Sequence, residues 1–182
     1  AQLARYYGLP SFNTGAGCDA KVVDAQAAAE VTMGIFLNAL SGLTLTQTMG
    51  TMAGGTFGSL EMLVICDEIV GMAKRILRGV EVSDEKLAVD LIRTIGPGGH
   101  FLDQEHTLRH FREEFFFARL FDRREIPQWE AEGGKRIDEV AGARVRKILS
   151  QPAPQLLSSS AERALNQCFK KLIREGRALS PR

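Results

Sequence analysis

The sequence has few cysteines, no excess of either charge and no long apolar run. Its 182 residues include 23 Lys and Arg against 22 Asp and Glu, giving a formal net charge of +1. This balance provides no basic stripe that could neutralise a run of phosphates, which argues against a nucleic-acid partner. Acidic residues or glycines interrupt the apolar stretches well short of the roughly 20 residues that span a bilayer, so we expect no membrane partner.

Cysteine is scarce and widely spaced. Cys18, Cys66 and Cys168 are odd in number and far apart, which fits neither a disulfide framework nor a zinc site and predicts free thiols in the cytoplasm. The chain begins at Ala1 without a charged-then-apolar leader. We therefore expect a protein that is not secreted and that has further sequence upstream of this chain.

The two halves of the sequence differ in composition. Residues 1–80 contain 5 basic and 6 acidic residues with 11 glycines, and residues 81–182 contain 18 basic and 16 acidic residues with 7 glycines. An apolar, glycine-rich segment is typical of buried strands wrapped by helices, whereas a charged, periodic segment is typical of surface helices. We therefore predict a boundary near residues 79–83, with one part at 1–80 and the other at 81–182.

The first half predicts a strand, a loop and a helix, repeated twice. Residues 8–12 form an extended run before a glycine loop at 14–18, and residues 22–40 are helix formers. After Gly42, residues 43–46 alternate like a strand, a second glycine loop spans 50–58, and Ser59 begins another helix. Strands joined by a helix of this length pair in parallel, so we predict an α/β fold.

The second half predicts a series of helices, which makes the chain helix-rich as a whole. Ser83 is the expected N-cap of a helix that stops at Gly96. Further helices are predicted from about residue 103, from about residue 135 to the proline-containing segment 151–154, and from a capping box of Ser159 and Glu162 to Gly176.

The two glycine loops lie where parallel α/β folds place their sites, after a strand and before a helix. Neither loop matches a dinucleotide or Walker pattern, because Gly15-Ala-Gly17 lacks the third glycine. Polar and apolar side chains alternate in them, which favours an amphipathic pocket: Asn13, Thr14, Cys18, Asp19 and Lys21 in the first loop, and Gln47, Thr48, Met49, Thr51, Met52, Thr56 and Phe57 in the second. The alternative is structural, with Asp19 or Asp24 capping the next helix and the threonines binding loop amides.

Three acids lie on the otherwise apolar helix that follows the second loop. Glu61, Asp67 and Glu68 need partners in such a helix. They either form structural ion pairs with Arg75 or Arg78, which is the expected case, or they face a site.

The three histidines, His100, His106 and His110, fall within one short segment. His106 and His110 would share a helix face, but the zincin glutamate is missing and no cysteine is near, so a metal site is the less favoured interpretation. A bent glycine loop that delivers His100 to a barrel mouth, or simply a turn that enters the next helix, explains the segment without a metal. Six of the ten phenylalanines lie between residues 101 and 121, and we expect them to pack against a partner surface.

Several ordered segments of the chain resemble the trimethylamine methyltransferase family. The resemblance covers about residues 5–150, and Trp129 with the charged helix that follows it also falls where the family has them. The segments that carry it are residues 15–26, 58–68, 78–80, 96–102, 106–108 and 110–113.

The resemblance implies a TIM-type (β/α)8 barrel. Residues 1–80 are similar to its last two βα units, and residues 81–182 to a helical C-terminal extension. A closed barrel needs about 250 residues, so the implied protein is longer than this chain. The exposed strand edge and the phenylalanines are then expected to meet the missing N-terminal barrel portion or a second copy of the chain.

The family's reaction moves a methyl group from a methylated amine to the Co(I) corrinoid (cobalamin) of a separate carrier protein. The resemblance therefore implies a small methylated amine and a corrinoid carrier protein as partners, with no metal bound directly by this chain. Members that use trimethylamine carry pyrrolysine, and no non-standard residue occurs here, so a quaternary amine is the expected substrate. Such a cation already has a neutral leaving group, and the enzyme must orient its methyl group and exclude water.

The resemblance also suggests site residues, although it assigns no catalytic one. Gln47 stands where related members often have His, and Ala20 replaces a Ser of the family. The candidates for substrate binding are Asp19, Gln47, Met49, Phe57 and Glu61, and those for the rim or the carrier-facing surface are Gly98, Gly99 and His100. Two other functions stay open: a non-catalytic barrel portion that serves as an assembly module, and a metal-assisted hydrolase that uses the three histidines.

Overall fold

The computed structural model describes residues 1–152 and 154–174. By its internal contacts the chain forms two units, residues 1–148 and residues 149–182. The predicted division between barrel units and helical extension, at residue 80, stays a prediction. The described elements are α1 (Gln2–Tyr6), β1 (Phe12–Asn13), α2 (Ala25–Leu40), β2 (Leu45–Thr46), β3 (Thr51–Met52), the 3₁₀ turn η1 (Ala53–Gly55), β4 (Phe57–Gly58), α3 (Leu60–Arg78), α4 (Asp84–Leu87), α5 (Val89–Ile95), α6 (Glu105–Glu114), α7 (Ile126–Ala131), α8 (Ile137–Leu149) and α9 (Ser159–Arg174).

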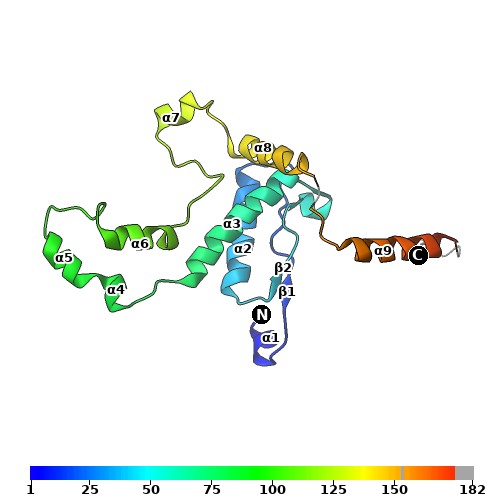
Figure 1. Cartoon of the computed structure of the whole chain (residues 1–182), viewed down its shortest axis with the longest axis horizontal. Coiled ribbons are helices and arrows are strands. Elements are labelled where there is room, and N and C mark those ends of the chain that lie inside the picture. Colours follow the sequence, from blue (N-terminus) through cyan, green and yellow to red (C-terminus); the bar gives the residue numbers. More distant parts are fainter. Residues whose placement is uncertain (153, 175–182) are drawn as a thin grey trace. The chain divides into compact units, whose positions relative to one another are not determined.

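A parallel strand pair joined by a helix opens the first unit. Strands β1 and β2 pair in parallel, with Phe12 opposite Leu45 and Asn13 opposite Thr46, and α2 forms the connection between them (Figure 1). The parallel pairing predicted from the sequence is confirmed. Each strand is only two residues long, however, and so shorter than the runs 8–12 and 43–46 suggested. The closed barrel stays a prediction.

Helix α2 begins at a capping aspartate. The Asp24 carboxylate accepts a hydrogen bond from the Ala27 amide at 3.1 Å, which satisfies one of the amides that the first turn leaves unpaired. The helix therefore begins at Ala25 and not at residue 22 as predicted. Of the two capping candidates, Asp24 has this role, and Asp19 lies in the loop before it.

The second glycine loop contains a small hairpin that the sequence did not predict. Strands β3 and β4 pair antiparallel, Thr51 opposite Gly58, with the turn η1 between them. Helix α3 follows, and the Ser59 hydroxyl accepts a hydrogen bond from the Met62 amide at 3.1 Å. The predicted start of this helix at Ser59 is confirmed.

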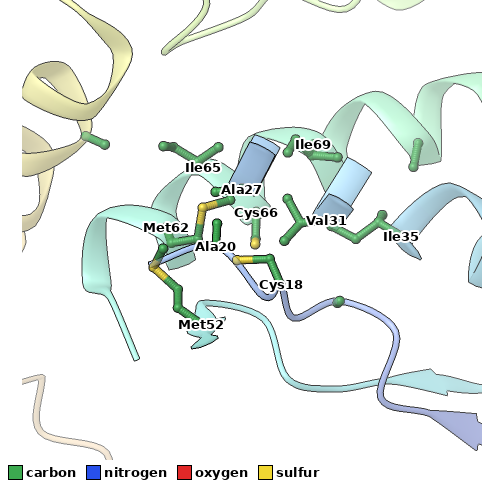
Figure 2. Close-up of a cluster of buried hydrophobic side chains, with 13 residues drawn as sticks. Cys18, Ala20, Ala27, Val31, Ile35, Met52, Met62, Ile65, Cys66 and Ile69 are labelled. Atoms are coloured by element: carbon green, nitrogen blue, oxygen red, sulfur yellow. The ribbon is translucent and has the colours of Figure 1, made fainter. Parts of the chain in front are cut away.

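The buried core of the first unit lies between α2, α3 and the two loops. Figure 2 shows Ala27 of α2 close to Ile65 of α3, Val31 of α2 close to Ile69 of α3, and Met52 close to Met62. Cys18 and Ala20 of the first loop and Ala141 of α8 belong to the same cluster. Burial of this apolar surface favours the folded state, and it holds both loops against the helices that flank them.

The predicted helix from Ser83 to Gly96 is two helices. The Ser83 hydroxyl caps α4 by accepting the Lys86 amide at 3.2 Å, as expected. The chain then passes through a left-handed residue at Ala88, with φ of 49°, which separates α4 from α5. Gly96 ends α5 with φ of 66°, the kind of C-terminal position that glycine favours.

The acids of α3 do not pair with its arginines, so the ion pairs predicted from the sequence were wrong. Arg75 and Arg78 instead bind Glu114 of α6, at 2.6 Å and 3.4 Å, and Lys86 of α4 binds the other oxygen of that carboxylate at 2.7 Å. The three cations favour the ionised carboxylate, so one glutamate ties α6 to α3 and α4.

This network predicts an acid-sensitive attachment. The hydrogen bond from Lys86, together with the charges of Lys86, Arg78 and Arg75, holds the pKa of Glu114 below its usual 4.5. A lowered folded-state pKa stabilises the protein above pH 4.5, and that stabilisation is lost as the pH falls through the folded pKa. Glu114→Gln should therefore lower the melting temperature at neutral pH, and the gap to the wild type should close below pH 4.5. A gap that stays constant with pH contradicts this.

The second unit contains α9, whose apolar side chains share one face as predicted. Leu165, Phe169 and Leu172 are each about half exposed. The hydroxyl of Ser158 accepts the Ala161 amide at 3.3 Å, so Ser158 is the cap and the predicted capping box that begins at Ser159 was wrong. The predicted helix end at Gly176 lies outside the described residues. In residues 1–152 and 154–174, no helix is both long and apolar enough to cross a membrane.

Candidate functional site

Hydrogen bonds join the loops that follow β1 and β2 into one structure. The Thr48 hydroxyl donates to the Thr14 carbonyl, and the Cys18 amide donates to the Thr51 carbonyl at 3.0 Å. The Gly54 amide in turn donates to the Cys18 carbonyl at 3.3 Å. Thr48 has φ of 72°, a left-handed conformation that is rare for a β-branched residue. Such conformations concentrate at functional sites.

These loops enclose a pocket of about 580 Å³ at the carboxyl ends of β1 and β2, which we call the loop pocket. Its two charged residues, Asp19 and Glu30, are both acidic. The apolar residues that the sequence suggested for this site lie elsewhere, since Met52 is in the core and Phe57 is on β4. The lining consists of Thr14, Gly17, Cys18, Asp19, Glu30, Thr48, Thr51, Gly54 and Gly55.

Sequence reasoning missed Glu30, which reaches the loop pocket from α2. One oxygen of its carboxylate accepts the Asp19 amide at 2.6 Å, and the other accepts the Gln26 side-chain amide at 2.7 Å. The hydrogen bond from Gln26, followed by that from the Asp19 amide, lowers the pKa of the Glu30 carboxyl below its usual value. The spacing of Gln26 and Glu30, four residues apart on a helix that follows a glycine loop, was the available signal.

The cysteines near the loop pocket are neutral thiols. Burial raises the pKa of the Cys18 thiol, and it also raises that of Cys66 in the core. A thiol with a raised pKa is a poor nucleophile at neutral pH. The prediction that the three cysteines are free thiols is confirmed, and Cys18 contributes shape to the pocket.

The structure does not bring the five predicted substrate-binding residues together in one pocket. Asp19 lines the loop pocket, whereas Met49 lines a pocket of about 700 Å³ between α3 and α8. Glu61 lines a third pocket, of about 670 Å³, and accepts a hydrogen bond from the Ser59 hydroxyl at 2.9 Å. Gln47 is exposed directly after β2, and its backbone amide donates a hydrogen bond to the Asn13 backbone carbonyl at 3.1 Å. Phe57 is 43% exposed.

Two of the three histidines connect α6 with α4. The Nε2 atom of His106 lies 2.8 Å from the Glu85 carbonyl oxygen, and that of His110 lies 3.0 Å from the Glu85 carboxylate. His110 also approaches the Lys86 ammonium at 3.1 Å. Within the part of the chain that the structure describes, no group of three His, Cys, Asp or Glu residues could hold a metal ion. The hydrolase interpretation therefore finds no ligand set there.

The glycine turn before α6 is exposed. Gly98 has φ of 82°, and a Cβ atom on Gly99 would come within 2.3 Å of the Ile95 side chain. His100 lies 3.6 Å from the Asp103 carboxylate, and both side chains are largely exposed. The role of these residues at a rim or a carrier-facing surface stays a prediction.

Most of the clustered phenylalanines line a pocket of their own, of about 1050 Å³. Phe111, Phe115, Phe116, Phe117 and Phe121 all belong to its lining. Phe115 and Phe117 keep 68% and 58% of their surface exposed. Their expected contact with a partner surface stays a prediction.

A polar pocket formed by loops at the carboxyl ends of parallel strands is the arrangement in which α/β proteins bind their ligands. The comparisons with known proteins go further: the chain belongs to the trimethylamine methyltransferase family, whose sequence profile matches residues 1–176. The resemblance seen in the sequence is thereby confirmed.

Three relatives show how much of a family member this chain represents. It is 36% identical to a trimethylamine methyltransferase of Desulfitobacterium hafniense strain DCB-2, over 86% of this chain and 32% of that protein. It is 36% identical to a glycine betaine methyltransferase of strain Y51, over 91% and 34%. It is 40% identical to a trimethylamine methyltransferase of Methanosarcina mazei, over 82% and 30%. The chain thus spans about a third of the length of these relatives.

Proposed function

We propose that this chain forms part of an enzyme that moves a methyl group from a methylated amine to the Co(I) corrinoid of a separate carrier protein. Family membership supports the reaction class, because relatives are named as methyltransferases of trimethylamine and of glycine betaine. The single observation in the structure that supports a site is the loop pocket at the carboxyl ends of the parallel strands.

In this proposal, residues 1–80 are the last βα units of a TIM-type barrel and residues 81–182 are its helical extension. The parallel pair of β1 and β2 with its connecting helix supports the barrel, because that fold repeats this unit. Active sites of such barrels lie at the carboxyl ends of the strands. The loop pocket occupies that position.

The charge of the loop pocket supports a cationic substrate. Both oxygens of Glu30 already accept hydrogen bonds from the protein, so Asp19 is the charged lining residue that we assign to the amine. A carboxylate attracts a quaternary ammonium ion. In the reaction the C–N bond breaks, its electron pair stays on nitrogen, and the amine leaves as a neutral molecule. The methyl carbon forms its new bond with the electron pair of the Co(I) acceptor. The residues of this chain would orient the cation and exclude water.

The corrinoid is a co-substrate in this proposal and belongs to the carrier protein.

The direct test is an amine-dependent methylation assay. The complete enzyme of which this chain forms part is purified and mixed with cob(I)alamin as a stand-in for the carrier. Methylation is followed by the change in absorbance with tetramethylammonium, glycine betaine or trimethylamine as donor. We expect turnover with a quaternary amine. If the enzyme methylates cob(I)alamin with none of the three amines, the proposal is contradicted.

Gln47 is the residue whose substitution tests substrate contact. If its side chain touches the amine, Gln47→Ala in the otherwise complete enzyme should lower amine-dependent methylation of cob(I)alamin about tenfold, which corresponds to about 1.4 kcal/mol of transition-state stabilisation. Gln128→Ala, on an exposed position of α7, is the matched control and should leave the rate unchanged. Equal rates for the wild type and Gln47→Ala would remove Gln47 from the site.

An assembly module is the second candidate, and exposed apolar side chains on the strand pair favour it. Phe12 of β1 and Leu45 of β2 are opposite each other and remain 64% and 59% exposed. A module of this kind would associate with a partner or a second copy without catalysing transfer. Analytical ultracentrifugation beside the methylation assay separates the two candidates, because stable association without turnover supports only the module.

A further inference from the structure

Glu30 holds the backbone of the loop that forms one wall of the loop pocket. Its carboxylate reaches from α2 to the Asp19 amide at 2.6 Å, and the Gln26 side chain fixes its other oxygen at 2.7 Å. With a partner on each oxygen, the carboxylate is oriented and cannot rotate freely. The first loop also contains Gly15 and Gly17, which have no side chain to restrict the backbone. The Glu30 carboxylate, as a hydrogen-bond acceptor from outside the loop, therefore restricts a backbone that the glycines leave free.

The segment around Asp19, which is hydrogen-bonded to Glu30, is also hydrogen-bonded to the second loop. On one side of Asp19, the Cys18 amide donates a hydrogen bond to the Thr51 carbonyl at 3.0 Å, and the Cys18 carbonyl accepts one from the Gly54 amide at 3.3 Å. On the other side, the Ala20 carbonyl accepts the Ala53 amide at 3.1 Å. The backbone from Cys18 to Ala20 thus lies between the Glu30 carboxylate and the second loop.

We propose that Glu30 is a positioning residue for methyl transfer, which sets the shape of both loops through its hydrogen bond to the Asp19 amide. The inference rests on the proposed function for its kinetic effect only. What Glu30 supplies is an acceptor oxygen at a fixed distance from α2, and its negative charge is not required for that task.

Two conservative variants separate reach from charge. Glu30→Gln keeps an acceptor oxygen for the Asp19 amide at the same distance and removes the charge; the Gln26 side-chain amide then turns over, so that its oxygen accepts from the new NH2 group. Glu30→Asp keeps the charge and shortens the side chain by one methylene group. Amide hydrogen exchange should be faster than in the wild type at Asp19 and at residues 51–54 in Glu30→Asp, and unchanged in Glu30→Gln. We expect kcat/KM for the amine to fall about tenfold in Glu30→Asp and to stay within about threefold of the wild type in Glu30→Gln.

Glu130→Ala is the matched control, because it removes an exposed carboxylate from α7; it should change neither measurement. Wild-type exchange in Glu30→Asp overturns the inference. So does the reverse kinetic order, with Glu30→Asp active and Glu30→Gln impaired, since that result assigns the role to the charge. A wild type without activity on any amine contradicts the proposed function, while the exchange rates still decide whether Glu30 positions the loops.

Discussion

The substitution Gly34→Ala is expected to lower the free energy of unfolding of the first unit by about 3 kcal/mol or more. Gly34 lies inside α2, where a glycine normally costs stability relative to alanine. A Cβ atom at this position would come within 1.6 Å of the Gly15 carbonyl oxygen. Because that oxygen belongs to the backbone, the helix and the first loop would have to separate. Urea denaturation of the purified protein measures the loss.

Gly142→Ala is the matched control for this prediction. Gly142 also lies inside a helix, α8, but the nearest atoms to a new Cβ belong to Arg146 and Glu61 at 3.5 Å and 3.8 Å. These are ordinary contacts, so alanine should stabilise the helix by up to about 1 kcal/mol. If both glycine variants change stability in the same direction and to the same extent, the close approach of α2 to the first loop is wrong.

The contact between Gly34 and Gly15 also bears on the site. The first loop rests on α2 at Gly15 and is bound to α2 again by Glu30, four residues before Gly34. One face of α2 therefore fixes the position of the first loop, which forms one wall of the loop pocket. A helix residue with a side chain at position 34 would disturb the loop pocket and the stability together.

Helix starts were the most predictable part of this fold. Ser83 was expected as a cap and Ser59 as the start of a helix, and both hydroxyls accept a hydrogen bond from an amide three residues on. Asp24 was one of two candidates and has that role. A cap depends on residues within one helical turn, so the sequence contains the whole interaction. At Ser159 the prediction failed by one residue, because Ser158 offers the same chemistry.

Interactions between distant segments were not predictable in the same way. Arg75 had acidic neighbours on its own helix, yet its partner is Glu114, 39 residues away. The sequence placed both glycine loops at the carboxyl ends of strands, and the structure does join them there. The sequence could not show that Met49 and Glu61 line other pockets, or that Glu30 lines the loop pocket. Each of these placements depends on how α2, α3 and α8 pack.

Glu68→Ala is expected to lower the free energy of unfolding of the first unit by about 3 kcal/mol. Glu68 is 4% exposed on α3, and one of its oxygens accepts both the Arg119 amide and the Leu120 amide, the latter at 3.1 Å. Alanine would leave two backbone donors without an acceptor and would open a cavity beside Leu120. Thermal and urea denaturation measure the effect, and exchange at the two amides should become faster.

Two variants show whether the acceptor oxygen is the cause. Glu68→Gln keeps an oxygen of similar reach, so it should recover at least half of the loss caused by alanine. Asp67→Ala removes the adjacent but exposed carboxylate, and its effect should stay within about 0.5 kcal/mol. If Glu68→Ala is no more harmful than Asp67→Ala, then Glu68 does not hold the segment around residues 119 and 120. Arg119 and Leu120 also line the pocket of about 1050 Å³ that the clustered phenylalanines form. The attachment of that segment to α3 would then depend on Phe116, whose ring lies against the helix at Gly71.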